Sequence, residues 1–398
     1  MISSCWSRNA VHPEPPKSLL SPLVVPEKTL MAPGPSNSST RVLNAMKNQI
    51  LGHLHPEICE MMDEIKAGLQ YVFQTKNRLT LAISASGHGG MEACLGNILE
   101  KGETVLISKC GIWGERAANM ATRIGAHVEF LETKPGVAFT LDQLELAVRK
   151  HRPTAVFVVH AESSTGMKQP LQGVGEVVHR YGGLLIVDTV ASLGGEPFYA
   201  DAWGVDVVYT GSQKVLGASP GITPVTFSPA AEKKIFERRT QVPVYYWDMT
   251  ILGDYWSCFD KPTRVYHHTI SATLVYGLRE ALAQLAEEGL RNTWARHAAA
   301  ADRLETKLSA LGLEFFIPNP ENRLKTIISI KIPDGVDWKV VVDHAMKKYR
   351  MEIGGGLGPT VGKIFRIGVM GVNASADHVD RLFGALDEGL RYARRSKL

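Results

Sequence analysis

The chain has 398 residues, too many for one small domain, and this length suggests two or three structural units. Hydrophobic residues make up 44% of the chain and charged residues 21%, an ordinary globular composition that can form a large core without a disulfide or metal staple. The formal net charge of +4 is mildly basic and no basic stripe with interleaved aromatic residues is present, so nucleic acid is not an expected partner.

The five cysteines are odd in number and widely spaced, and none forms a CxxC pair. This spacing argues against a zinc site or a redox dithiol, and it predicts reduced thiols and no bound metal. No uncharged apolar run reaches ~18 residues, so we expect no membrane-spanning helix. The N-terminal segment lacks the apolar centre of a secretory signal.

The sequence ends in Ser396-Lys397-Leu398. A terminal Ser-Lys-Leu tripeptide is a peroxisomal address that an import receptor binds. We therefore expect a peroxisomal protein with this receptor as a partner. The stretch up to Val11 has no acidic residue and contains Arg8, which leaves a mitochondrial presequence as the alternative.

In chain order, the first expected element is an extended arm. Residues 1–35 contain seven prolines. Because proline fixes φ and has no backbone N–H, this segment is expected to be extended and not helical.

Short apolar runs then alternate with stretches of helical spacing. The expected strands are 79–84, 104–108, 128–131, 154–159, 184–187 and 205–209, and the expected helices between them are 91–99, 115–124, 141–150 and 174–181. This alternation predicts an α/β fold with a mostly parallel sheet between helices. We expect a large domain over residues 36–282, with its ligand at the carboxyl ends of the strands.

A smaller α+β domain is expected over residues 283–398. Its expected helices are 290–311, 338–349 and 374–395, and its expected strands are 315–317, 326–332 and 363–370. The glycine-rich segment Gly354–Pro359 predicts a loop between them.

Two residues at neighbouring strand ends form the main chemical proposal. Asp188 ends the apolar run LLIVD, and Lys214 follows the next strand in the segment YTGSQKVLG. Taken singly, the aspartate is as well explained as a cap or turn residue, and the lysine as a solvated loop residue. Together they are the pair that pyridoxal 5′-phosphate (PLP) requires: an amine for its aldehyde and a carboxylate that keeps its pyridine nitrogen protonated.

Four further sites are candidates that each have an ordinary structural alternative. Ser86–Gly90 joins a strand to a helix, where glycines and free N–H groups suit a phosphate, although a packing turn has the same pattern. Trp113 could stack on a ring or fill the core, and the hydroxyls of Ser163–Gly166 could bind a ligand or form a turn. Arg366 interrupts an apolar strand, and its guanidinium matches a carboxylate.

Many ordered segments make the chain similar to a known family. They are MAPGPSNSSTRVLNAM, LGHLHPE, MDEIKAGLQYVFQT, SGHGGMEA, GIWGERA, AESSTGM, VDTVASLGG, GSQKVLGASPGITP, YHHTI, YGLREALA, GGGLGPT and FRIGVMG. In these segments the chain resembles the alanine–glyoxylate aminotransferase family, which are class V PLP enzymes of fold type I. The resemblance runs from about Pro22 to the C-terminus and implies a large PLP domain and a small C-terminal domain.

The resemblance also implies roles for single residues. Lys214 is similar to the lysine that forms a Schiff base with the cofactor and moves the α-proton, and Asp188 to the partner of the pyridine nitrogen. Trp113 resembles the ring-stacking tryptophan, and Ser163 the serine near the ring hydroxyl. The residues similar to phosphate ligands are Ser86, Gly87, His88 and Gln213.

Substrate and partner contacts are implied in the same way. Arg366 resembles the clamp for the substrate carboxylate, with Ser163 and Gly34 beside it. Tyr266 and Thr269 resemble residues that the other subunit donates to the phosphate. The resemblance therefore implies a homodimer with shared active sites and an N-terminal arm that wraps the partner.

The activity implied is ping-pong transfer of an amino group from L-alanine to glyoxylate through Lys214, and serine–pyruvate transamination is a related expectation. Relatives that act on 3-hydroxykynurenine are the main alternative, although the segments Gly52–Glu57 and Gly211–Lys214 are similar to the glyoxylate type. A cysteine desulfurase would need a mobile cysteine, and Cys258 lies between aromatic residues. Hydrolysis of a carbon–carbon bond and a catalytically inactive binding protein are further alternatives.

Overall fold

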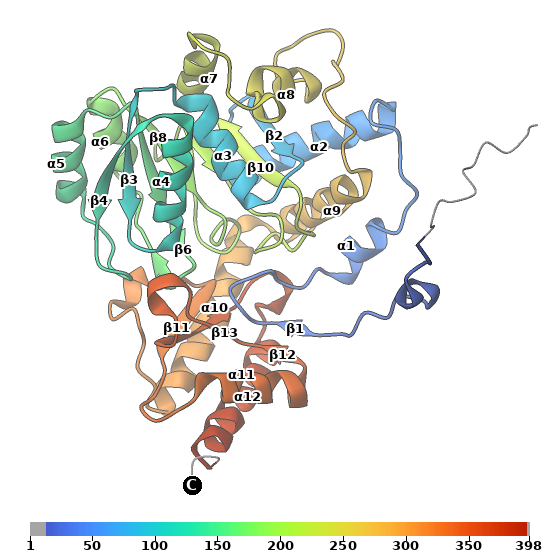
Figure 1. Cartoon of the computed structure of the whole chain (residues 1–398), viewed down its shortest axis with the longest axis vertical. Helices are drawn as coiled ribbons and strands as arrows, with labels where there is room; N and C mark the ends of the chain where they lie inside the picture. Colours follow the sequence, from blue (N-terminus) through green and yellow to red (C-terminus); the bar gives the residue numbers. More distant parts are fainter. Residues whose placement is uncertain (1–12, 396–398) are drawn as a thin grey trace, which may run out of the picture.

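The computed structural model describes residues 13–395, in which a large unit with a central sheet sits above a smaller C-terminal unit (Figure 1). The first part of the expected arm and the Ser396-Lys397-Leu398 tripeptide lie outside the described residues. No helix within residues 13–395 is long and apolar enough to cross a bilayer.

The α-helices are α1 (Thr40–Ala45), α2 (Pro56–Phe73), α3 (Gly87–Ile98), α4 (Ile112–Ile124), α5 (Leu141–His151), α6 (Val174–Arg180), α7 (Pro229–Phe236), α8 (Met249–Tyr255), α9 (Ala272–Glu288), α10 (Leu290–Ala310), α11 (Trp338–Tyr349) and α12 (Ala376–Arg395). The strands are β1 (Thr29–Leu30), β2 (Leu79–Ile83), β3 (Thr104–Lys109), β4 (His127–Glu132), β5 (Ala155–Val159), β6 (Ala161–Glu162), β7 (Met167–Lys168), β8 (Leu184–Asp188), β9 (Val207–Tyr209), β10 (Thr223–Phe227), β11 (Ile327–Lys331), β12 (Met351–Glu352), β13 (Gly354–Gly355) and β14 (Ile364–Gly368).

The central sheet has seven strands in the order β2-β10-β9-β8-β5-β3-β4. Strand β10 runs antiparallel to both its neighbours, and the other pairings are parallel. The α/β fold with a mostly parallel sheet is therefore confirmed. All five positions of β2, β5 and β10 are buried, as expected for strands covered on both faces.

The order of the strands explains how helices cover both faces. Helices α3 and α4 each lead to a strand nearer the β4 edge of the sheet. Helices α5 and α6 each lead to a strand farther from that edge, first β5 and then β8. Because such crossovers are right-handed, the two pairs of helices lie on opposite faces. In agreement, α3 packs on α4 and α5 packs on α6. The direction reverses between β3 and β5, which is where open α/β sheets bind ligands.

The smaller unit contains an antiparallel sheet in the order β11-β14-β13, on which the last three helices form a second hydrophobic core. Strand β1 of the N-terminal arm pairs with β12 and so ties the arm to this unit (Figure 1). Helix α9 crosses residue 283, and Leu285 and Leu290 still pack in the larger core. The boundary at residue 283 stays a prediction.

The structure differs from the sequence expectations in three places. The loop expected at Gly354–Pro359 is wrong at its start, where Gly354 and Gly355 form β13 and pair with β14. The strand expected at 315–317 is wrong, because only Phe315 forms an isolated bridge, to Ile330. Pro318 follows at once and has no N–H to continue the pairing. No strand was predicted at β10, in which Pro224 stands, a residue that is uncommon in central strands.

Candidate active site

A cavity of about 150 Å³ lies at the carboxyl edge of the central sheet. Its lining residues come from segments at the ends of several different strands of the large unit. They are Ser86, Gly87, His88, Met91, Trp113, Ala161, Ser163, Asp188, Val190, Ala191, Tyr209, Gln213 and Lys214. The fold therefore brings together the residues that the sequence proposed for the cofactor, apart from Tyr266 and Thr269.

Asp188 ends β8 and is 3% exposed. Its Oδ1 accepts a hydrogen bond from the N–H of Val190 at 2.8 Å, and its Oδ2 accepts one from the hydroxyl of Tyr209 at 2.5 Å. Burial raises the pKa of the Asp188 carboxyl to about 6, against these hydrogen bonds and the charge of Lys214, which favour the ionised form. The carboxylate is thus a buried acceptor beside the cavity.

Tyr209 is a site residue that sequence reasoning missed. It ends β9 next to β8, is fully buried, and holds Asp188 through its hydroxyl. In the sequence it is one aromatic residue at the end of an apolar run, which is typical of a core residue. The hydrogen bond from the Tyr209 hydroxyl to Asp188 becomes evident only from the fold, in which Tyr209 stands opposite Asp188 on the neighbouring strand.

Lys214 lies in the turn after β9, and its Nζ donates a hydrogen bond to the carbonyl of Pro33. Burial lowers the pKa of the amine to about 8; the charge of Arg366 lowers it further, and the charge of Asp188 opposes the shift. A perturbed lysine inside a cavity is the physical pattern of a functional amine.

The segment Pro33–Ser36 lies directly over Lys214. The N–H of Ser36 donates to the carbonyl of Gln213 at 2.8 Å, and its hydroxyl donates to the carbonyl of Lys214 at 2.5 Å. A Cβ at Gly34 would lie 2.7 Å from Cε of Lys214, and the φ of Gly34 is +117°. Glycine at this position therefore lets the backbone approach the lysine side chain.

Trp113 stands in the first turn of α4, and its Nε1 donates to Oγ of Ser163 at 2.7 Å. The ring of His88 packs edge-on against it with centroids 5.6 Å apart. Three side chains from three strand–helix connections thus form one wall of the cavity. This placement agrees with an aromatic group that stacks on a flat ligand.

The first turn of α3, which carries His88, also lines the cavity. Ser86 is the N-cap residue, and its side chain makes no capping hydrogen bond. The first N–H groups of a helix have no acceptor within the helix, and the helix dipole favours an anion there. Gln213 reaches the same cavity from the turn of Lys214.

Arg366 comes from β14 in the smaller unit and is 9% exposed. Its Nη1 donates to the carbonyl of Ser163 and its Nε to the carbonyl of Gly355, each at 2.8 Å. Within residues 13–395 no carboxylate forms an ion pair with it. Burial lowers the pKa of the guanidinium to about 10, and the charge of Glu162 opposes this shift. Arg366 is not among the residues that line the cavity, and it borders the cavity through the carbonyl of Ser163.

Comparison with known proteins fits this geometry. The family model described as aminotransferase class V matches residues 30–382. The chain belongs to the class V aminotransferase family. An alanine–glyoxylate aminotransferase of Drosophila melanogaster is 50% identical over 381 residues, which cover 96% of each chain. The (S)-ureidoglycine–glyoxylate transaminase of Bacillus subtilis is 33% identical over 90% of this chain and 89% of its own.

A solved structure supports the same relationship. The crystal structure of an alanine–glyoxylate aminotransferase from Nostoc sp. is 47% identical in sequence and matches with a TM-score of 0.91. The match covers 93% of this chain and 97% of that chain. The fold type expected from the sequence is confirmed for this aminotransferase.

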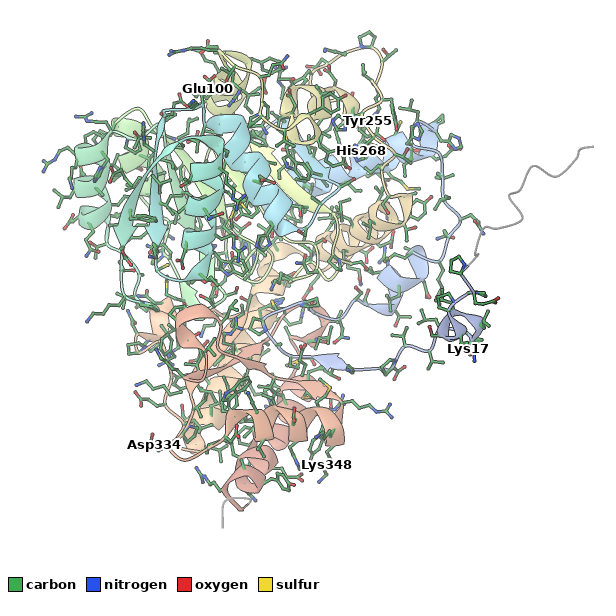
Figure 2. All side chains as sticks on the ribbon, in the orientation of Figure 1. Lys17, Glu100, Tyr255, His268, Asp334 and Lys348 are labelled. Atoms are coloured by element: carbon green, nitrogen blue, oxygen red, sulfur yellow. The ribbon has the colours of Figure 1, made fainter. Side chains whose placement is uncertain are left out.

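Tyr266 and Thr269 of the aminotransferase do not line the cavity of their own chain. Tyr266 is 49% exposed, and its hydroxyl lies 3.3 Å from that of Thr269. Next to them, His268 contacts Oγ of Ser84 at 2.7 Å and packs on Tyr255 (Figure 2). Their contribution to the site of a partner subunit stays a prediction.

Cys258, the candidate nucleophile of the desulfurase alternative, is 3% exposed, and burial raises the pKa of its thiol to about 11. It is also absent from the cavity lining. A buried, protonated thiol is a packing residue and not a nucleophile.

Proposed function

We propose that this aminotransferase transfers the amino group of L-alanine to glyoxylate, giving pyruvate and glycine, with PLP bound in the cavity at Lys214. The observation that carries the proposal is the convergence of Lys214 and Asp188 on one cavity, with Arg366 bound to the carbonyl of Ser163 in its wall. The printed names of the relatives support the substrates, since both the Drosophila and the Nostoc proteins are called alanine–glyoxylate aminotransferases.

The residues of the cavity fit PLP. The buried amine of Lys214 suits covalent attachment, and the buried carboxylate of Asp188 suits a protonated ring nitrogen. Trp113 suits the ring face, Ser163 the ring hydroxyl, and the uncapped first turn of α3 suits a phosphate. Ser86, Gly87, His88 and Gln213 would be the phosphate-side contacts. When bound, PLP supplies a ring that stabilises negative charge at the α-carbon of the amino acid.

Arg366 would bind and orient the substrates. L-Alanine, glyoxylate, pyruvate and glycine all carry a carboxylate, and a guanidinium binds this group through two parallel hydrogen bonds. Because Arg366 is buried and has no carboxylate partner within the described chain, a substrate carboxylate would supply its counter-ion. Ser163, which Arg366 contacts, and Gly34, which lies against the side chain of Lys214, would border the substrate.

Lys214 would move the proton. A base must be neutral to accept the α-proton, and the lowered pKa of Lys214 makes a neutral amine accessible near pH 8. The same Nζ would then give the proton to C4′ of the cofactor, so that one group serves both half-reactions. The carbonyl of Pro33 and the segment around Gly34 keep this amine over the cavity.

A dimer with shared sites, and a peroxisomal location, belong to the same proposal. In the described part of the arm, Leu19, Leu20, Leu23, Val24 and Val25 are 70–88% exposed, an apolar surface that suits the flank of a second subunit. Tyr266 and Thr269 would then reach the phosphate of the partner's cofactor. Ser396-Lys397-Leu398 would bind the import receptor.

The first half-reaction tests the proposal. Purified protein loaded with PLP and mixed with L-alanine alone should give pyruvate in an amount equal to its sites. After the unreacted alanine and the pyruvate are removed, added glyoxylate should give the same amount of glycine. Serine tests the serine–pyruvate activity in the same assay. If alanine gives no pyruvate and 3-hydroxykynurenine is transaminated instead, the enzyme is a 3-hydroxykynurenine transaminase and the proposal is wrong.

A further inference from the structure

Glu162 is a fully buried carboxylate beneath the wall of the cavity, and the roles given above do not use it. It ends β6, directly after the buried Ala161 that lines the cavity. Within residues 13–395 all its hydrogen bonds come from uncharged groups. Oε1 accepts from the N–H and the hydroxyl of Ser164 at 3.0 and 2.5 Å, and Oε2 accepts from the N–H of Trp113 at 3.3 Å.

The surrounding backbone is shaped to admit this carboxylate. A Cβ at Gly111, the N-cap residue of α4, would overlap the carboxyl group of Glu162. The carboxylate thus occupies the N-terminus of α4, where the helix dipole stabilises negative charge. The hydroxyl of Ser164 connects the carboxylate of Glu162 with the start of α4, because it also accepts a hydrogen bond from the N–H of Ile112 at 3.3 Å.

The same carboxylate is linked to both the ring-facing and the substrate-facing side chains. Its bond to the backbone of Trp113 fixes the turn that carries the indole, and the indole in turn donates to Ser163. Arg366 donates to the carbonyl of Ser163. Burial raises the pKa of the Glu162 carboxyl to about 7, and its ionised form supports the charged form of Arg366 against burial.

We propose that Glu162 is a positioning residue that holds Trp113, Ser163 and Arg366 together as one wall of the cofactor and substrate site. It touches neither cofactor nor substrate and acts through these three groups. The inference rests on the proposed function, because it assumes that PLP and a substrate carboxylate bind against this wall.

Glu162→Gln tests the proposal. The amide has the size of the carboxylate but no charge, and its NH₂ group must face one of the donors that the carboxylate now accepts from. The dissociation constant of PLP for the apoprotein should rise about tenfold, which is the loss of one charged hydrogen bond. The KM for both L-alanine and glyoxylate should rise as well, with a smaller change in kcat.

Glu196→Gln is the matched control. Glu196 is also buried, at 2% exposed, and its carboxylate accepts from the N–H of Lys325 and pairs with Lys168, away from the cavity lining. Both variants should lower the melting temperature, but only Glu162→Gln should change PLP affinity and KM. A structural role alone would lower the melting temperature and leave both constants at their wild-type values.

The outcomes separate this inference from the proposed function. Wild-type protein that does not bind PLP would overturn the proposed function. Wild-type protein that binds PLP, with the same dissociation constant and KM values for Glu162→Gln, would overturn the role of Glu162. If Glu162→Gln does not fold, Ser164→Ala decides: removal of its hydroxyl should shift the same constants less strongly, and unchanged constants would overturn the proposal.

Discussion

At the residue scale, the site depends on ionisable groups that are out of water and close together. Lys214 has a pKa of about 8, so roughly a tenth of it is neutral at pH 7, against roughly one part in three thousand for an ordinary lysine. Asp188 has a pKa of about 6 and is mostly ionised at the same pH. The carboxylate is therefore ionised above about pH 6, and the neutral amine becomes the main form above about pH 8, so the pair that the proposed chemistry requires increases as the pH rises.

Arg366→Gln should have two effects. The KM for alanine and glyoxylate should rise roughly a hundredfold, because a buried charged partner of the carboxylate is lost. The charge of Arg366 also lowers the pKa of Lys214, so its removal should shift the pH profile of PLP capture by the apoprotein to higher pH. Stopped-flow absorbance across pH 6–10 measures this shift.

Arg323→Gln is the control for that substitution, since Arg323 pairs with Glu305 outside the cavity lining. It should leave both the KM and the pH profile unchanged. A wild-type KM in Arg366→Gln would contradict the role of Arg366 as the carboxylate clamp.

Tyr209→Phe should weaken PLP binding in a pH-dependent way. The phenol donates to the ionised form of Asp188 and so opposes the rise in its pKa; without it the pKa of Asp188 moves further up. At pH 7 we expect PLP affinity to fall about tenfold, the effect of one hydrogen bond to a charged group. Equilibrium titrations should show the loss shrinking as the pH rises, and a loss independent of pH would contradict this account.

At the element scale, six strands of the central sheet could be predicted because they are short apolar runs, most of which end in polar residues, whereas helices α1, α2, α7, α8 and α9 were not predicted. Asp188 and Lys214 were found in this way. The segment over Lys214 could not be placed, because its contact joins residues 181 apart in the chain. Tyr209 and the contact of Glu162 with Trp113 were missed for a related reason: each contact joins residues that follow different strands, and local sequence carries no trace of it.

Strand β10 is a strand that the local sequence pattern argues against. Pro224 argues against a central strand, yet β10 pairs on both sides. The pairing with β9 begins only at Val225, so Pro224 lies beyond it. Register, which sequence does not reveal, decides whether a proline is tolerated.

Gly34→Ala should disturb the segment over Lys214. The new Cβ would meet the lysine side chain, and φ lies in the left-handed region, so PLP capture should slow at least tenfold and unfolding free energy should fall by ~1–3 kcal/mol. Gly335→Ala is the matched control for Gly34→Ala, since Gly335 also has a positive φ, +74°, but has open space around its Cβ position. It should lower stability and spare PLP capture; similar capture rates in the two variants would contradict the proposed contact.

At the scale of the whole molecule, one chain supplies an incomplete set of the expected phosphate contacts. Tyr266 is half exposed and outside its own cavity, and the arm around Lys17 extends away from the body of the chain with an apolar surface (Figure 2). A second copy of the chain would account for both features.

Mixing two inactive variants tests the shared site. Lys214→Ala removes the amine, and Tyr266→Ala removes a contact proposed to serve the other subunit. When the two are unfolded, mixed equally and refolded, half the dimers are mixed and carry one intact site, so activity should recover to about a quarter of wild type. No recovery, with dimers present by sedimentation, would place Tyr266 in the site of its own chain or in none.

Transfer of nitrogen from alanine to glyoxylate through Lys214 can be followed with an isotope. The most direct measurement supplies ¹⁵N-labelled L-alanine and unlabelled glyoxylate to the PLP-loaded protein and follows the label by mass spectrometry. The account predicts ¹⁵N-glycine and pyruvate in equal amounts from the wild type and neither from Lys214→Ala. Unlabelled glycine, release of labelled ammonia, or turnover at the wild-type rate by Lys214→Ala would contradict it.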